Sequence, residues 1–199
     1  MDRNRTALIL DGSLGHGGVA LLALSGPLSE ELMVAEPGEP QRSYLERINT
    51  LLPSESSRAE LSAIVVGVGP GSYTGIRAAS AAAAGVAAAL HLPIITIPSD
   101  RALYAAANEV GGGTVVLPLG TREALVIREA GSEIAAHADA PASADLARVA
   151  SRLPFALANL ASPALSEVLA AAARGEAPQR SAIQLLYPSP PRGTNGRGL

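Results

Sequence analysis

Short apolar runs, separated by turns that contain glycine or proline, open the chain. Three of them, at 6–11, 18–24 and 28–35, have the length of strands and predict an antiparallel meander. From about Glu39 to Leu52 the apolar residues recur at helical spacing, and a proline then ends the predicted helix. This helix is expected to bury Tyr44, Leu45, Ile48, Leu51 and Leu52 and to expose Arg42, Glu46, Arg47 and Asn49.

The middle of the chain alternates strands and helices. A strand at 63–68 leads through a glycine-rich turn into a helix at 78–90 that is apolar on every side. A strand at 93–97 follows, then a helix at 100–108 with Ser99 as its N-cap. This order predicts an α/β fold in which helical crossovers cover the faces of a mixed sheet.

The second half of the chain has a weaker pattern. The elements expected there are strands at 114–119, 124–128 and 133–137, a helix at 143–153, a short strand at 155–159 and a helix at 163–173. Proline, glycine, arginine and serine dominate from Arg174 onward, and 189–199 is expected to be disordered. The predicted organisation is a first lobe at 1–98, a shortened second lobe at 99–175 and a partly disordered tail at 176–199.

The alanine-rich helix carries two different stripes. Its bulkier residues, among them Ile76, Val86 and Leu90, are expected to face the sheet, and the remaining side chains are very small. A stripe of small side chains lets a second helix approach closely. The chain's own second half is short and has few large apolar residues to cover that stripe, so a partner protein is the favoured explanation. The predicted contact residues, called the outer stripe below, are Ala78, Ala81, Ala82, Gly85 and Ala89.

The glycine-rich loop allows two interpretations. The start of a helix after such a loop offers free N–H groups and a positive dipole end to a phosphate. The same glycines can serve a tight turn and close packing, and glycine spacing alone is weak evidence for phosphate binding, so we favour packing. The residues concerned are Gly69, Pro70, Gly71, Ser72, Thr74, Gly75 and Arg77.

Asp11 and Ser13 end the first strand and are the candidates for a residual nucleotide or metal site. An acidic residue at a strand end can position magnesium or a water molecule. Asp and Ser also form turns through local hydrogen bonds, and we favour that interpretation because no second carboxylate stands at a motif distance. The three histidines are scattered, so no metal site is predicted.

Composition excludes several kinds of chemistry. All 15 basic residues are arginine, so the chain has no lysine for a Walker-type phosphate loop or a Schiff base. It has no cysteine, and its net charge of −3 gives no sign that it binds nucleic acid or an anionic membrane by itself. The N-terminus shows no signal sequence, and the 13 uncharged residues between Arg77 and His91 are too few to span a bilayer. We expect a cytoplasmic location.

Two segments carry a resemblance to a known family. The run GVGPGSYTGIR at Gly67–Arg77, with its alanine-rich helix and the following LPIITIPS at Leu92–Ser99, resembles the signature of the bacterial TsaB (YeaZ) proteins. The opening LILDGS at Leu8–Ser13 is similar to that family's first hairpin. The resemblance extends from about Thr6 to Ala107.

The resemblance implies a fold and a role. The fold is that of the actin-like ATPases (ribonuclease H-like), with two lobes and mixed sheets. The role is that of a non-catalytic scaffold in the synthesis of threonylcarbamoyladenosine, the modified adenosine beside the anticodon of tRNAs. Such a subunit pairs with the paralogue TsaD and works with the ATPase TsaE, so ATP and metal are expected on those partners and tRNA is met only in the complex. Homodimers through the same helices are a further expectation.

Departures from the family pattern favour a scaffold over an enzyme. Gly12 stands where the family has threonine, 120–126 keep only part of a usual second-lobe motif, and 156–159 lack the usual Gly-Asp-Gly turn. The alternative function is a small actin-like ATPase or phosphotransferase that uses Asp11 and the loop Gly69–Gly75.

Overall fold

The computed structural model describes residues 6–15, 18–23, 30–34, 43–176 and 182–187. Its larger sheet has the strand order β3-β2-β1-β4-β5. The strands β1 to β3 form the predicted antiparallel meander, and β4 and β5 continue the sheet in parallel with β1. All five were predicted from the apolar runs. They are β1 Thr6–Asp11, β2 Gly18–Ala23, β3 Glu30–Val34, β4 Leu61–Gly67 and β5 Ile94–Ile97.

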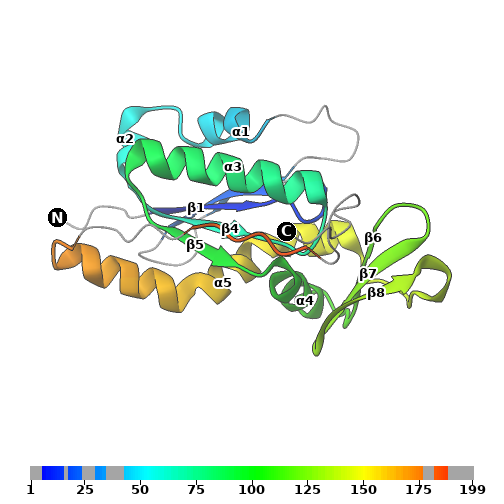
Figure 1. Ribbon diagram of the computed structural model, residues 1–199. Coiled ribbons are helices and arrows are strands. Elements are labelled where there is room, and N and C mark those ends of the chain that lie inside the picture. Colours follow the sequence, from blue (N-terminus) through cyan, green and yellow to red (C-terminus); the bar gives the residue numbers. More distant parts are fainter. Residues whose placement is uncertain (1–5, 16–17, 24–29, 35–42, 177–181, 188–199) are drawn as a thin grey trace, which may run out of the picture.

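Three helices lie on one face of this sheet (Figure 1). They are α1 Tyr44–Leu51, α2 Glu55–Ala59, which the sequence did not predict, and α3 Tyr73–Leu90. Ser43 and Glu46 form a capping box at the start of α1, whereas residues 39–42 of the predicted helix lie outside the described residues. Ser72 caps α3, so α3 begins five residues before the predicted range, and Gly75 and Arg77 belong to the helix rather than to a loop.

Two assignments of inner and outer residues on α1 were wrong. Leu45 is 57% exposed, and Arg47 is only 5% exposed. The buried face of α1 is centred on Ile48 and Leu51, and successive helix residues are about 100° apart. Leu45 therefore turns away from the core, and Arg47 turns toward it.

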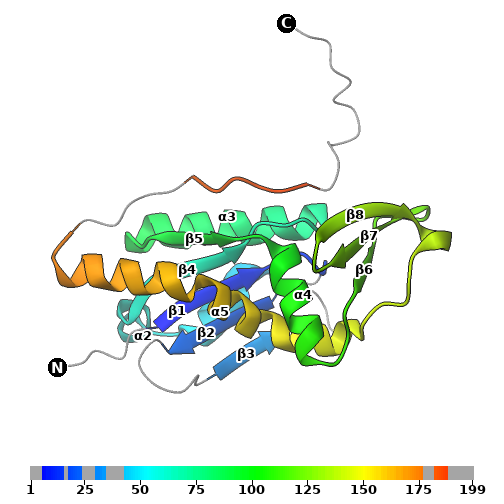
Figure 2. The same cartoon turned by 90° about the horizontal axis from the view of Figure 1, so that it is seen from below.

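The other face of the sheet is covered by α5 Leu146–Ala173, and α4 Ser99–Glu109 packs on α5 (Figures 1 and 2). The predicted pair of helices separated by a strand at 155–159 is wrong, because α5 runs through this segment and holds Pro154 and Pro163 inside it. A proline inside a helix costs about 3 kcal/mol. Burial offsets this cost, because one side of α5 packs into the core at helical spacing through Val149, Leu153, Leu157, Ala161 and Leu165.

Of the described helices, α5 is the one long and apolar enough to cross a membrane when judged by length and composition alone. Of its most apolar 18-residue window, 28% is buried within the chain. Its buried side faces the larger sheet and belongs to the same core as residues of β1 and β4.

A smaller antiparallel sheet follows α4 and has the order β6-β7-β8. Its strands, predicted within a few residues, are β6 Val115–Pro118, β7 Glu123–Arg128 and β8 Gly131–Ala136. One core joins the two sheets: Ile9 of β1, Leu103 of α4, Leu125 of β7 and Leu157 of α5 belong to the same cluster. A second core lies between the larger sheet and the helices α1 and α3.

The chain returns to the larger sheet near its end. Residues 182–187, called the strap below, run in extended form beside α3 and β5 (Figure 2). The amide of Leu186 donates to the carbonyl of Val68 at 2.8 Å. The ring of Tyr187 lies 5.2 Å from the ring of Tyr73, measured between centroids. The predicted disordered residues 189–199 lie outside the described residues.

Candidate functional site

The carboxylate of Asp11 lies buried at the end of β1 and accepts hydrogen bonds on both oxygens. The amide of Ser13 donates to Oδ1 at 2.7 Å, and the Ser13 hydroxyl donates to the same oxygen. The Ser99 hydroxyl donates to Oδ2 at 2.7 Å. Burial raises the pKa of Asp11 above its ordinary value, and the bonds from Ser13 and Ser99 offset part of that rise.

Ser99 does not have the role that the sequence predicted for it. Pro98 occupies the N-cap position of α4, and Ser99 is the first helical residue and completely buried. Its oxygen accepts a hydrogen bond from the amide of Gly69 at 3.0 Å while its proton goes to Asp11. Ser99 thus joins β1, the glycine-rich loop and α4. No local pattern signals this role, because the three segments are distant in the sequence.

The glycines of this region are explained by close contact. A Cβ built on Gly12 would lie 2.1 Å from the carbonyl oxygen of Gly75, and one built on Gly67 would lie 1.7 Å from Oδ2 of Asp11. Gly69 has a φ of +91°, in the region that favours glycine. Packing, the favoured interpretation of the loop, therefore accounts for these positions.

The start of α3 is packed against the turn that follows β1. The amide of Ser72 donates to the carbonyl of Ser13 at 2.8 Å, and the amide of Gly75 donates to the Ser72 hydroxyl at 3.3 Å. Two of the N–H groups that a phosphate would need already have protein partners.

One small cavity borders Asp11. Its volume is about 20 Å³, and Leu153, Pro154 and Leu157 of α5 line the same cavity. That volume suits about one water molecule. Among the described residues, no group of three or more His, Asp or Glu side chains is placed to hold a metal ion. Asp11 thus forms a buried cross-link between the end of β1 and the start of α4.

Tyr44 connects α1 to the end of β1. Its hydroxyl donates to the backbone carbonyl of Asp11 at 3.0 Å. Burial raises the pKa of Tyr44, and the negative charge of Asp11 raises it further. The phenol therefore keeps its proton at all moderate pH values and remains a donor.

The outer stripe of α3 lies on the side of the helix that faces away from the sheet. Ala78, Ala81, Gly85 and Ala89 are exposed, and Ala82 is half-buried. Of the helices of the second half, α5 covers the opposite face of the sheet (Figure 1) and α4 packs on α5, so the alternative in which they enclose α3 is wrong. The sequence did not predict that Leu45 of α1 would be a large exposed apolar side chain.

Comparison with known proteins gives a consistent result. The family model "TsaD: tRNA N6-adenosine threonylcarbamoyltransferase" matches residues 37–153, more than half of the chain. No curated protein matches the sequence. A crystal structure described as an uncharacterized protein with similarity to peptidase YEAZ from Pseudomonas aeruginosa has a TM-score of 0.56 and 22% identity, covering 90% of this chain and 100% of that one.

A second solved structure, YeaZ from Pseudomonas aeruginosa, has a TM-score of 0.52 and 24% identity, covering 82% of this chain and 97% of that one. At this identity the two structures establish the fold. The predicted relationship to TsaB (YeaZ) proteins and the actin-like (ribonuclease H-like) α/β fold are both confirmed.

Proposed function

Because the chain belongs to the TsaD family of tRNA N6-adenosine threonylcarbamoyltransferases, we propose that it serves the threonylcarbamoylation of tRNA adenosine as a scaffold subunit. It has no catalytic activity of its own and binds no cofactor; ATP and metal belong to its partners. It pairs with a TsaD paralogue, works with a TsaE ATPase, meets tRNA only in that complex and is cytoplasmic.

The exposed outer stripe is the observation that carries the pairing. It offers a helix face of Ala78, Ala81, Gly85 and Ala89, against which a partner helix can approach closely. The structure leaves open space around Gly85, since a Cβ built there would meet no atom within 4 Å. A stable specific contact buries on the order of 1,200–2,000 Å² in total.

The geometry around Asp11 supports the absence of catalysis. The carboxylate is buried, accepts hydrogen bonds on both oxygens and shares a small cavity with residues of α5. A group in this state is not available to orient magnesium or a nucleophilic water.

The homodimer expected from the resemblance would use the same outer stripe. A second copy of the chain and the TsaD paralogue would therefore compete for this surface.

The test is co-purification with a TsaD protein from the same organism. Ala81→Arg and Gly85→Arg place a long charged side chain in the outer stripe, and each should abolish the complex, because burying an unpaired charge costs several kcal/mol. Both positions are exposed, so the variants should fold, whereas Ala82 is half-buried and less suited to the test. Ala170→Arg, at an exposed position of α5 on the opposite face, is the matched control and should leave the complex intact.

Threonylcarbamoyladenosine formation in a reconstituted system should fall in parallel with complex formation. If both arginine variants bind TsaD as the unmodified chain does, the outer stripe is not the contact. If the unmodified chain neither binds TsaD nor is needed for the modification, the scaffold role is wrong.

A further inference from the structure

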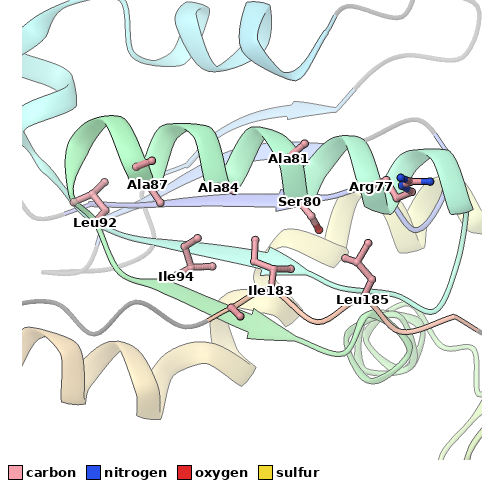
Figure 3. Close-up of a pocket in the computed structure, with 11 residues that line it drawn as sticks. Arg77, Ser80, Ala81, Ala84, Ala87, Leu92, Ile94, Ile183 and Leu185 are labelled. Atoms are coloured by element: carbon pink, nitrogen blue, oxygen red, sulfur yellow. The ribbon is translucent and has the colours of Figure 1, made fainter.

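A groove runs between α3 and the strap, and it shares one residue, Ala81, with the outer stripe. Its volume is about 450 Å³, within the range of about 300–1,000 Å³ that is usual for small-molecule sites. Ala84 and Ala88 of α3 form one wall, Leu92 and Ile94 the floor, and Ile183 and Leu185 of the strap the other wall (Figure 3).

A buried hydroxyl without a partner lies in this apolar groove. Ser80 is 7% exposed, and its Oγ has no hydrogen-bond partner. Its oxygen points from α3 toward the strap (Figure 3). Leaving a buried hydroxyl unpaired costs free energy, which a ligand group bonded to it would recover.

A cation lies one helical turn from Ser80, at the end of the groove away from Leu92 (Figure 3). The Arg77 guanidinium donates to the Tyr73 hydroxyl at 2.7 Å, and its central carbon lies 5.1 Å from the centre of that ring. This contact orients the guanidinium and uses one of its five N–H donors. Among the described residues, no carboxylate forms an ion pair with Arg77.

We propose that this groove binds an amphipathic carboxylate of the medium-chain fatty acid type. The carboxylate lies between Arg77 and the Ser80 hydroxyl, and the hydrocarbon chain extends past Ala84 and Ala88 against Ile183. The arrangement supplies what such a ligand needs: one cation, one unpaired hydroxyl and an apolar channel of sufficient volume. This inference goes beyond the scaffold function and does not depend on it.

The experiment is a titration of the full chain with octanoate, followed by methyl NMR and calorimetry, with 1-octanol as the uncharged probe of equal length. Saturable octanoate binding is expected, with shifts at the methyls of Ala84, Ala88, Ile183 and Leu185. Arg77→Gln should weaken octanoate binding about tenfold and leave 1-octanol binding unchanged, because only the charge-assisted bonds are lost. Ser80→Ala should weaken octanoate binding by about three- to tenfold.

Filling the groove gives an independent check. Ala84→Leu should abolish binding of both probes, and Ala88→Leu serves if the first variant does not fold; both positions are exposed. Ala170→Leu, on the exposed side of α5, is the control and should bind octanoate normally. The proposal is overturned if octanoate does not saturate, if the leucine in the groove leaves binding intact, or if Arg77→Gln affects both probes equally.

Discussion

The hydroxyl of Ser99 donates a hydrogen bond to Oδ2 of Asp11 at 2.7 Å, across 88 positions of the sequence. This bond joins the end of β1 to the start of α4, and through the Gly69 amide it also holds the glycine-rich loop. In the ATPase alternative, the carboxylate of Asp11 would have to be accessible. In the structure, it instead helps to connect the end of β1, the glycine-rich loop and the start of α4.

Ser99→Ala should lower the free energy of unfolding by about 2–3 kcal/mol, because it leaves both the Asp11 carboxylate and the Gly69 amide short of a partner in a buried place. Urea denaturation followed by circular dichroism measures this. Ser166→Ala, which removes an exposed hydroxyl from α5, is the matched control and should change stability by no more than about 0.5 kcal/mol. Equal effects of the two substitutions would show that the cross-link is unimportant.

The pH dependence of stability should carry the signature of Asp11. Its pKa is raised in the folded state, so the folded chain holds this proton more tightly than the unfolded chain does. The raised pKa of Asp11 therefore contributes to the free energy of unfolding. This contribution is fully present below the ordinary pKa of about 3.9 and is lost as the pH rises through the pKa of the folded state. The asparagine of the Asp11→Asn variant does not titrate, so this variant lacks the pH-dependent contribution to stability.

The measurement is urea denaturation of both proteins at a series of pH values from about 3 up to the highest pH at which both remain folded. The stability of the unmodified chain minus that of Asp11→Asn should decrease as the pH rises through this window and then become constant. A difference that increases with pH would mean that the pKa of Asp11 is lowered by folding.

Magnesium ATP should not bind through Asp11. The cavity beside its carboxylate holds about one water molecule, and the amides of Ser72 and Gly75 at the start of α3 already donate to Ser13 and Ser72. Calorimetry should therefore give the same result for the isolated chain and for Asp11→Asn. Micromolar binding that disappears in Asp11→Asn would instead favour the ATPase alternative.

Gly12 and Gly85 should respond to alanine in opposite directions. Gly12→Ala should destabilise the fold by several kcal/mol, because its Cβ would meet the backbone of Gly75 at 2.1 Å and neither segment can move alone. Gly85→Ala, where the space is open and the backbone is helical, should stabilise α3 by about 0.5–1 kcal/mol. Thermal unfolding compares the two. A neutral Gly12→Ala would show that the turn after β1 is not tightly packed on α3.

Much of the fold followed from local pattern. The strands β1, β2, β4, β5, β6 and β7 coincide with short apolar runs, because a buried strand needs a run of apolar side chains. The predicted helices at 78–90 and 100–108 lie within α3 and α4. The pattern failed at α5, where Pro154 and an apolar run imitated a helix end and a strand. Packing of α5 on the sheet outweighs the local cost of its prolines, and that energy is not visible in a local window.

The amino-acid sequence by itself determined the order of the strands, most of the helices of the first half, the family and the small side chains of the outer stripe. Only the tertiary structure decided that Ser99 bonds to Asp11 instead of capping α4, that residues of α5 line the small cavity beside Asp11, and that the strap makes a groove with Ser80 and Arg77. The reason is physical: spacing along the chain governs contacts within a helix or strand, whereas contacts between distant segments depend on how whole elements pack.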